Sequence, residues 1–559
     1  MSALDKLKVL VIEANQGMRA QLRTMLEGFR ITGVQFAPTA GSAVRKLRES
    51  GFDVIFCDHD LGEGQDGQHL LEDLRSRAII PRRTLFIMIT SERNYERVIG
   101  TAELSPDDYI LKPLTASTLQ QRLERALNRR EVFMPLYRAL DSGDSAAALS
   151  YCQQAEHQHP RYHIDFMRER AELLATLGQF SEAQQVFEAI LAEKPVPWAR
   201  LGLARMHFAQ QRYHEAEPLL QDLVKENAYF LAAYDWLART RQQTGDIAQA
   251  RAVLSEAVNM SPHRIGRLRT YAAVSMDAGD FESAESTLTE VVRKGKYSDF
   301  RVPEDHVALV RAQLARDRVE EAEATARDLD KSMPGVPEAS VCSALTRALI
   351  HKARNDHDKA RQAVLDALAA GAGNADLSRE LKQQLVEACL ANRLDAEGSE
   401  LVADMLRTAE DVHSLESSRA VLRKHGRDDL ADAVEQKIHA EVKNVVARGA
   451  QKAQAGDFDG AVQEMMGAVR KLPGNPHVLL NATLALLRHI EHKGWNERFA
   501  DQARMLINRT RKLDPDNSRL EALTQFMQNL ARKYGVRADR ATAPQEPERP
   551  PNPGIAWMR

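Results

Sequence analysis

The stretch Val54-Ile55-Phe56-Cys57-Asp58 decides the fold of the N-terminal part of the chain, because four apolar residues in a row end at a carboxylate. Three other stretches have the same form, an apolar run followed by one polar residue: residues 9–13, 85–90 and 109–112. Such runs are typical of buried parallel strands, and open α/β sheets carry their functional residues at the carboxyl ends of those strands. We therefore expect four polar residues to converge on one site: Glu13, Asp58, Thr90 and Lys112.

Amphipathic stretches alternate with these runs up to about residue 130. Helices are predicted over residues 17–28, 40–50, 67–76, 93–103 and 115–129. Alternating strands and helices of this size imply a doubly wound parallel sheet with right-handed crossovers. The predicted fold class of residues 1–130 is therefore α/β.

A repeat begins after residue 130, where the strand signals stop. The motif Gly-x-aromatic-x-x-Ala starts at Gly178, Gly279 and Gly456, with looser copies between them. Alanines at the anchor position recur every 33 to 38 residues: Ala148, Ala183, Ala216, Ala250, Ala284, Ala322 and Ala360. A period near 34 is the length of the tetratricopeptide repeat (TPR), a pair of helices that stacks on its neighbours.

Three further positions of the repeat carry similar residues in successive copies, and each such set of equivalent positions is called a column below. A small residue precedes the anchor by twelve positions (Ala171, Ala204, Ala238, Ala272), and a large apolar residue follows it by four (Phe187, Leu220, Leu254, Leu288). Prolines that stop the second helix follow by twelve: Pro160, Pro195, Pro262, Pro473 and Pro515. We expect an all-α TPR solenoid of about ten or eleven hairpins over residues 131–535, with weak repeats near Leu394 and Ala431 in the blurred region 385–445.

The last residues, 536–559, are rich in Pro, Arg, Glu and Ala and are predicted to be disordered. The apolar end of this tail, residues 554–558, is a possible docking peptide, although a solvated tail is the preferred interpretation.

Composition narrows the classes of function. The net charge of −3 gives no overall attraction to nucleic acid or to an anionic membrane. The four cysteines lack zinc-site spacing, and no apolar stretch approaches membrane-spanning length. No phosphate loop, nucleophile elbow, kinase signature or helix-turn-helix occurs after residue 130. We expect a cytoplasmic protein that is not an enzyme, has no catalytic residues and binds neither nucleic acid nor membrane.

Residues 7–130 resemble the receiver domain of bacterial two-component response regulators. The resemblance rests on Asp58 at the phosphoacceptor position, Thr90-Ser91 at the switch hydroxyl, Asp108-Tyr109, and Lys112-Pro113. It implies a flavodoxin-like five-stranded sheet, a histidine kinase as phosphodonor, Tyr109 as the aromatic that moves on phosphorylation, and a cis peptide at Pro113.

The resemblance also implies a Mg²⁺ cofactor, with Glu13, Asp58 and Asp60 as its ligands. Receivers usually begin this site with two adjacent acids, whereas here the pair reads Glu13-Ala14, so metal affinity is expected to be weak. The loop over residues 58–67 also departs from the family. It has Gly62 where receivers commonly have proline, and it is one residue longer than the usual loop.

These features predict a response regulator in which phosphorylation of Asp58 modulates protein binding by the TPR array. The fifth predicted helix runs past residue 129 without Gly or Pro before Pro135, which offers a mechanical link. Two alternatives stay open: a phosphate sink or kinase-inhibiting regulator, and a constitutive scaffold with an inert receiver. Receivers often dimerise, so a homodimer is also possible.

The partner of the array is predicted to be a protein or peptide. The TPR frame places Arg168, Arg205, Arg239 and Arg269 on the groove, which suits an acidic peptide. The preferred alternative is that the groove is an ordinary solvent-exposed surface, on which the arginines are neutralised by Asp165, Glu172 and Asp235. Trp198, Phe208 and Trp236 are interpreted as packing between repeats.

Overall fold

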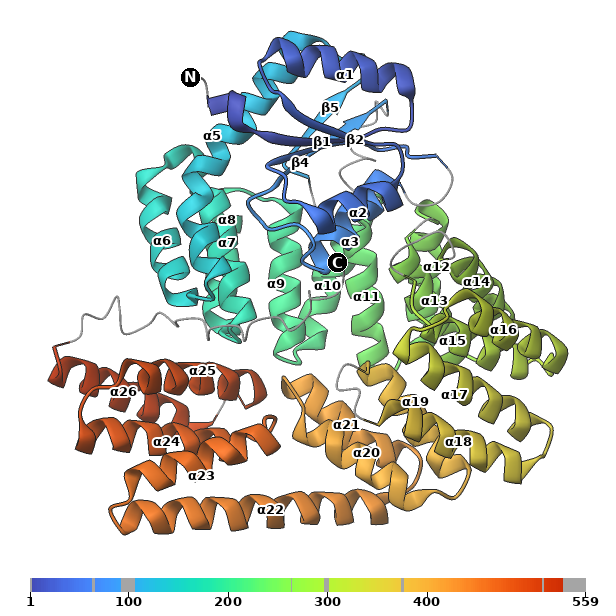
Figure 1. Cartoon of the computed structure of the whole chain (residues 1–559), viewed down its shortest axis with the longest axis vertical. Helices are drawn as coiled ribbons and strands as arrows, with labels where there is room; N and C mark the ends of the chain where they lie inside the picture. Colours follow the sequence, from blue (N-terminus) through green and yellow to red (C-terminus); the bar gives the residue numbers. More distant parts are fainter. Residues whose placement is uncertain are drawn as a thin grey trace, which may run out of the picture. The chain divides into compact units, whose positions relative to one another are not determined.

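The N-terminal part of the chain contains one parallel five-stranded sheet with the strand order β2-β1-β3-β4-β5 (Figure 1). The structure is a computed structural model that describes residues 3–62, 66–91, 106–262, 264–295, 301–372, 377–514 and 517–535. The strands are β1 (Lys8–Ile12), β2 (Gly33–Ala37), β3 (Val54–Asp58), β4 (Leu85–Thr90) and β5 (Asp108–Leu111). The predicted doubly wound α/β fold is confirmed.

Helices cover both faces of this sheet. One face carries α1 (Gln16–Gly28) and α5 (Ala116–Asp141), and the other carries α2 (Ala40–Glu49) and α3 (Gly67–Ser76). Successive strand residues point to opposite faces, so Val9 and Val11 pack with α1 and α5, whereas Leu10 and Ile12 pack with α2 and α3. Burial on both faces is the reason why the strands read as continuous apolar runs.

The predicted helices over residues 17–28, 40–50 and 67–76 agree with α1, α2 and α3 to within a residue. The helix predicted over 93–103 lies outside the described residues. The helix predicted over 115–129, and expected to run on toward Pro135, is α5, which continues past that proline to Asp141. Phe133 and Leu136 are fully buried at helical spacing, and after α5 the chain turns left-handed at Gly143, which has φ 72°.

Helices alone follow α5 in the described part of the chain. They are α6 (Ser145–Gln158), α7 (His163–Thr176), α8 (Phe180–Glu193), α9 (Pro197–Ala209), α10 (Tyr213–Glu226), α11 (Leu231–Gln243), α12 (Ile247–Met260), α13 (Ile265–Asp277), α14 (Phe281–Gly295), α15 (Glu304–Leu314), α16 (Val319–Ser332), α17 (Pro337–Ala353), α18 (His357–Gly371), α19 (Arg379–Ala391), α20 (Asp395–Arg407), α21 (Val412–Lys424), α22 (Asp428–Gln454), α23 (Phe458–Lys471), α24 (Pro476–Lys493), α25 (Glu497–Leu513) and α26 (Ser518–Lys533).

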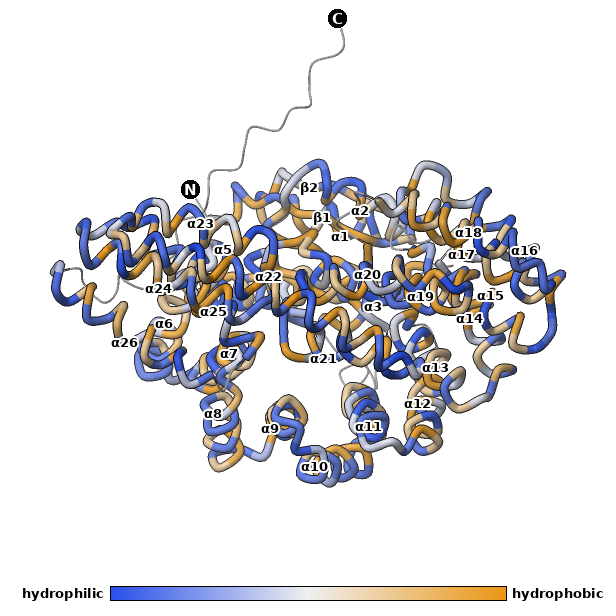
Figure 2. The backbone as a smooth tube through the Cα atoms, turned by 90° about the horizontal axis from the view of Figure 1, so that it is seen from below, coloured by the Kyte–Doolittle hydropathy of each residue, from blue (hydrophilic) through white to orange (hydrophobic). Residues whose placement is uncertain are grey.

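The chain forms two compact units, Met1–Met134 with Phe187–Leu394 and Pro135–Val186 with Asp395–Arg559. In the first unit, neighbouring helices pair as antiparallel hairpins, among them α9 with α10, α11 with α12, and α17 with α18. In the second unit, α24 and α25 pair in the same way, and α6 packs against α7, the first helix of the next repeat. Hydrophobic residues recur along each of these helices, as Figure 2 shows for α11 and α12.

The repeat columns predicted from sequence are packed in the interior. All seven anchor alanines have 0% exposure, and the small and large apolar columns are no more than 3% exposed. Second helices end just before the predicted prolines, at Gln158, Glu193, Met260 and Lys471, while Pro515 lies outside the described residues.

The turn inside each hairpin has a left-handed residue. Gly178, Gly279 and Gly456 have φ values of 75°, 76° and 80°. The looser copies of the motif have other residues in the same conformation: Gln211, Asp317, Asn355 and Arg393. Residues other than glycine pay a steric cost in this conformation. The turn therefore keeps its conformation even in the repeats where the sequence has no glycine.

The blurred region of the sequence contains regular helices with irregular spacing. The helix α22 has 27 residues and packs against α20, α21, α23 and α24. It serves as the second helix of one hairpin and the first helix of the next, with no turn between. One turn motif is therefore missing, which explains why the 34-residue period fails there.

Candidate functional site

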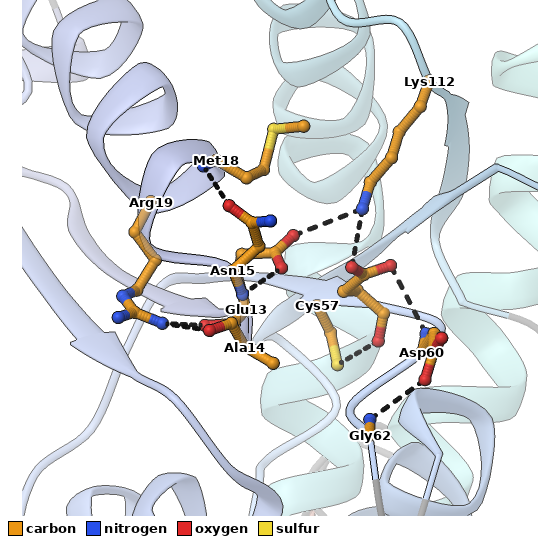
Figure 3. A network of polar contacts seen from close by, with 10 residues as sticks. Glu13, Ala14, Asn15, Met18, Arg19, Cys57, Asp60, Gly62 and Lys112 are labelled. Carbon is orange, nitrogen blue, oxygen red and sulfur yellow. Dashed lines mark hydrogen bonds and ion pairs between the residues drawn. The ribbon is translucent and has the colours of Figure 1, made fainter.

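Three of the predicted site residues meet at the carboxyl edge of the sheet. Lys112 Nζ lies 2.6 Å from Asp58 Oδ2 and 3.3 Å from Glu13 Oε2 (Figure 3). Glu13 and Asp58 are 2% and 6% exposed, so both carboxylates are buried beside one ammonium group. Thr90, at the end of β4, is also buried, and its carbonyl accepts a hydrogen bond from the Lys112 backbone N–H at 2.8 Å.

The electrostatics of this cluster favour a further cation. Two carboxylates share one ammonium, which leaves an excess of one negative charge when all three groups are ionised. Burial, helped by the proximity of Asp58, raises the pKa of Glu13 above its ordinary value. Burial alone lowers the pKa of Lys112, but hydrogen bonding and attraction to Asp58 and Glu13 outweigh it and raise that pKa. Lys112 is therefore held in its charged form.

Local backbone contacts orient Glu13. Its Oε1 accepts a hydrogen bond from the Asn15 backbone N–H at 2.8 Å. Asn15 in turn caps α1 by accepting from the Met18 N–H. The guanidinium of Arg19 donates to the carbonyls of Glu13 and Ala14, both at 2.7 Å. The turn after β1 is thus fixed by the first helical turn of α1.

A close backbone approach shapes the loop after Asp58. The Gly67 N–H donates to the His59 carbonyl at 2.9 Å, and the His59 N–H donates to the Ile89 carbonyl at 2.8 Å. A Cβ atom at Gly67 would lie 2.2 Å from the Asp58 carbonyl oxygen. Only glycine fits there, and sequence reasoning missed this role, although Gly67 stands at the first position of a predicted helix.

The three predicted metal ligands are not assembled as one cluster. The Asp60 Oδ1 accepts from the Gly62 N–H at 3.0 Å, which ties that carboxylate to its own turn, and the Asp60 N–H faces Asp58 Oδ1 at 3.4 Å. In the described ranges, no group of three or more His, Cys, Asp or Glu side chains is arranged to hold a metal ion. Glu13 and Asp58 alone lie within reach of a shared cation.

Tyr109 lies on β5, and Pro113 follows Lys112 just past the end of this strand. Tyr109, on β5, is partly buried and packs against the hydrophobic cluster beneath α2 and α3. The Lys112–Pro113 peptide is cis. Asp108 is held by Arg122 of α5, with an Nη1–Oδ1 distance of 3.1 Å.

The four groove arginines have different settings. Arg205 and Arg239 lie over the Trp236 ring, with 5.6 and 4.9 Å between the guanidinium carbon and the ring centroid. Arg269 makes a two-pronged ion pair with Asp305, both contacts 2.7 Å, so it is neutralised by an acid that sequence reasoning did not select. Arg168 is exposed on α7, in the other compact unit.

Asp235 does not neutralise the groove arginines, contrary to expectation. It forms a fork with the fully buried Arg267, with distances of 2.9 Å to Nε and Nη2, and contacts Arg264 at 3.1 Å. The rings of Phe208, on α9, and Trp236, on α11, pack edge to face with 5.2 Å between their centroids, as predicted for packing between repeats.

Arg264 also reaches the receiver part of the first unit. Its Nε lies 3.3 Å from Oε2 of Glu72, on α3. Burial lowers the pKa of Arg264 to about 10, against the opposing attraction of Glu72. One guanidinium therefore joins a helix of the α/β part to the Asp235–Arg267 fork.

Comparisons with known proteins agree with both parts of the fold. A family model described as the response regulator receiver domain matches residues 9–124. Models described as tetratricopeptide repeat match residues 137–195, 168–229, 231–264 and 306–328.

Individual relatives cover one part each. The chemotaxis protein CheY-3 of Vibrio cholerae is 28% identical over 123 residues, 22% of this chain and 93% of that protein. The sensory transduction protein RegX3 of Mycolicibacterium smegmatis is 33% identical over 124 residues, 22% of this chain and 50% of that protein. A tetratricopeptide repeat protein of Parabacteroides merdae has 13% identity and a TM-score of 0.33, covering 46% of this chain and 98% of that structure.

No helix in the described part of the chain is both long and apolar enough to cross a membrane. The matched regions follow one another along the chain in the order of its two folds. The N-terminal part of the chain therefore matches the response regulator receiver domain, and the helical part that follows it matches tetratricopeptide repeats.

Proposed function

We propose that a histidine kinase phosphorylates Asp58 and that the phosphorylated receiver changes how the TPR repeats bind a partner protein. The observation that carries this proposal is the 2.6 Å contact of Lys112 Nζ with Asp58 Oδ2, beside Glu13 at the carboxyl edge of the sheet. A buried carboxylate next to a fixed ammonium is the arrangement that phosphoryl transfer to an aspartate needs.

In the proposed transfer, an Asp58 carboxylate oxygen attacks the phosphorus of the kinase phosphohistidine. The P–O bond forms while the P–N bond breaks, and the imidazole leaves with the electron pair and takes a proton from solvent. The Lys112 ammonium, already in contact with Asp58, pairs with the oxygens of the transferred group. The Thr90 hydroxyl, at the end of the neighbouring strand, is the donor proposed to approach the new phosphoryl oxygens.

Magnesium fits the excess negative charge of this cluster. Glu13 and Asp58 would hold the ion, which matches the one or two carboxylates on which Mg²⁺ sites usually rely. When bound, the ion supplies positive charge that neutralises oxygens of the transferring group. Since Ala14 offers no ligand and the Asp60 carboxylate is engaged by Gly62, we expect weak affinity.

A polar path supports coupling between Asp58 and the repeats. The loop after Asp58 closes through Gly67 onto α3, and Glu72 of this helix pairs with Arg264 at the start of α13. Arg264 shares Asp235 with the buried Arg267. A movement of α3 on phosphorylation would therefore act on an ion-pair network that holds α11 and α13 together.

The proposed partner of the array is a protein segment with acidic side chains. Arg205 and Arg239 lie over Trp236, and arginine and tryptophan are among the residues most enriched where protein interfaces gain their binding energy. Arg269 is excluded from this role because Asp305 already neutralises it.

A constitutive scaffold with an inert receiver is the second candidate. The Glu13 Oε1 is engaged by the Asn15 N–H and the Oε2 by Lys112, and Ala14 replaces an acid. An ion would have to displace Lys112 from Glu13 before binding. This arrangement favours a receiver that only packs.

Phosphorylation is tested with acetyl phosphate and Mg²⁺, and aspartyl phosphate is read on phosphate-affinity gels. We expect a shifted band from the wild type and from the matched control Asp60→Asn, and none from Asp58→Asn. The same variants are then tested with the cognate histidine kinase. Failure of the wild type with both donors would exclude the switch and leave the scaffold.

A further inference from the structure

A cavity of about 450 Å³ opens in the second unit between the first and last helices of that unit. Its lining side chains come from α6, α25 and α26, with Leu177 and Gln179 from the turn after α7. This volume lies in the range of sites that bind a ligand or a peptide side chain, roughly 300–1,000 Å³. The lining of the cavity includes neither Asp58 nor Lys112, so a ligand can bind there without phosphorylation of Asp58.

The lining is mainly apolar, with positive charge and no negative charge. The apolar part includes Leu149, Leu177, Met505, Ile507 and Met527. Met505 is 47% exposed, one of three large hydrophobic side chains so exposed in the described residues. Solvent exposure of such a side chain inside a concave apolar surface is costly, roughly 25 cal/mol for each Å². A complementary apolar group would remove that cost.

Three arginines lie in this lining, and Arg511 and Arg532 are the two that add charge to it, because acids of α25 balance the charge of Arg504. Arg504 is paired with Asp501 and Glu497, and Arg511 donates to Asn508 at 3.2 Å. None of the described residues that line the cavity is Asp or Glu. The expected occupant is therefore an apolar segment flanked by at least one acidic residue.

The chain itself has one segment of this chemistry, joined to a helix that lines the cavity. Residues 554–558 read Gly-Ile-Ala-Trp-Met, the only run of consecutive large apolar residues after Gly535, and Glu546 and Glu548 precede it. The tail begins directly after α26, whose Ala531 and Arg532 line the cavity. The segment is thus tethered next to the surface that it matches.

The tether is long enough. The cavity residue farthest back on α26, Thr524, lies about 17 Å from Gly535 along the helix axis, at 1.5 Å per residue. Treated as a random coil, a stretch of about 20 residues, the number between Gly535 and Ile555, has a root-mean-square span of roughly 25 Å. A tether whose span matches the gap gives an effective concentration on the order of 1 mM, so even a weak site is filled from within the chain.

We propose that the α6–α25–α26 cavity binds the tail segment Ile555–Met558 of the same chain, with Trp557 as its anchor. A tryptophan is the residue expected to contribute most, because it buries roughly 150–250 Å². A partner protein that binds this cavity must displace the tail, so the tail acts as an intramolecular competitor.

Disulfide trapping in the full chain tests this proposal. The four native cysteines are buried and free, so an engineered pair reacts selectively. Met505→Cys with Ala556→Cys places one thiol in the cavity and one beside the anchor. The matched control pairs Ala556→Cys with Asn529→Cys, an exposed position on α26 that does not line the cavity and is nearer to the tail's root.

We expect the 505–556 pair to form an intramolecular disulfide at least tenfold faster than the 529–556 pair. Adding Trp557→Ala, which changes only the tail, should reduce the 505–556 rate to the control rate. Equal rates for the two pairs, or a rate that does not respond to Trp557→Ala, would overturn the proposal. Disulfide-linked dimers in place of the intramolecular bond would assign the cavity to a second copy and would overturn it as well.

Discussion

The Nζ atom of Lys112 lies 3.3 Å from Oε2 of Glu13, although 99 residues separate the two in sequence. The same atom contacts Asp58, so one side chain bridges the carboxylates that end β1 and β3. Removal of this ammonium would leave two buried carboxylates side by side with no cation between them, which costs free energy of folding and removes a partner for the phosphoryl group.

Lys112→Ala should therefore slow the phosphorylation of Asp58 by acetyl phosphate about tenfold or more. A charge-assisted hydrogen bond contributes roughly 1.5–3 kcal/mol, and 1.4 kcal/mol corresponds to a factor of ten in rate. The rate is measured by phosphate-affinity gels. Lys46→Ala is the control. In the described residues, the Lys46 ammonium donates to the Gln35 side chain at the surface of the receiver, away from Asp58. An unchanged rate in Lys112→Ala would remove Lys112 from the mechanism.

Glu13→Gln should raise the melting temperature of the receiver at pH 7. The pKa of Glu13 is raised by burial, so the folded state holds a proton more tightly than the unfolded state, whose value is near 4.5. Stability from this group is present below pH 4.5 and is lost as pH rises through the folded pKa. The variant removes that loss, so its advantage over the wild type should shrink at pH 4.

The same variant should weaken Mg²⁺ binding, measured by calorimetry, because it removes one of two carboxylates. Glu124→Gln, on the exposed face of α5, is the control for both measurements. A lower melting temperature at pH 7 would mean that attraction to Lys112 outweighs the cost of burial.

Gly67→Ala should destabilise the receiver by about 1–3 kcal/mol, since the added Cβ would lie 2.2 Å from the Asp58 carbonyl oxygen and the backbone must shift. The shift displaces the phosphoacceptor, so phosphorylation should fall too. Gly51→Ala is the matched control, because a Cβ at Gly51 meets nothing within 4 Å. Urea unfolding that gives equal stabilities for the two variants would show that the loop relaxes without cost.

Asp235→Ala should destabilise the repeats by about 3 kcal/mol, because it leaves the fully buried guanidinium of Arg267 without the carboxylate that it forks. The exposed pair of Glu290 with Arg293 supplies the comparison, and Glu290→Ala should cost less than about 0.5 kcal/mol. Chemical denaturation of the full chain measures both. Equal losses would mean that Arg267 finds other partners.

Glu72→Gln should weaken the ion pair with Arg264, and Arg264→Gln with the double variant completes a thermodynamic cycle that isolates this contact from the pair of Arg264 with Asp235. The two side chains are 14% and 22% exposed, so we expect a coupling of about 1 kcal/mol in a double-mutant cycle on thermal unfolding. Additive effects of the two single variants would show that the pair does not connect the receiver to the repeats.

The sheet and the meeting of Glu13, Asp58 and Lys112 were predictable from sequence. Parallel strands buried on both faces leave an unmistakable apolar pattern, and their carboxyl ends share one edge. The orientation of the Asp60 carboxylate was not predictable. It depends on a hydrogen bond from the Gly62 N–H, and the position of that N–H is set by the backbone conformation of the loop.

The repeats were predictable wherever glycine marks the turn, as at Gly178 and Gly279. The repeats anchored at Ala216 and Ala322 were predictable from their alanines, but the left-handed turns at Gln211 and Asp317 were not, because neither residue is a glycine. The ion pair of Arg269 with Asp305 was not predictable from sequence either. The two residues are 36 positions apart, and the packing of α13 against the next hairpin brings them together.

The helix α22 also affects how this array can evolve. Where each hairpin ends in its own turn, a whole repeat can be duplicated or deleted with both ends of the cut in loops. A 27-residue helix that belongs to two hairpins has no such boundary, so any gain or loss of a repeat there would sever a continuous helix. The segment from α20 to α24 must therefore be inherited as a single block, while the hairpins before it remain free to vary in number.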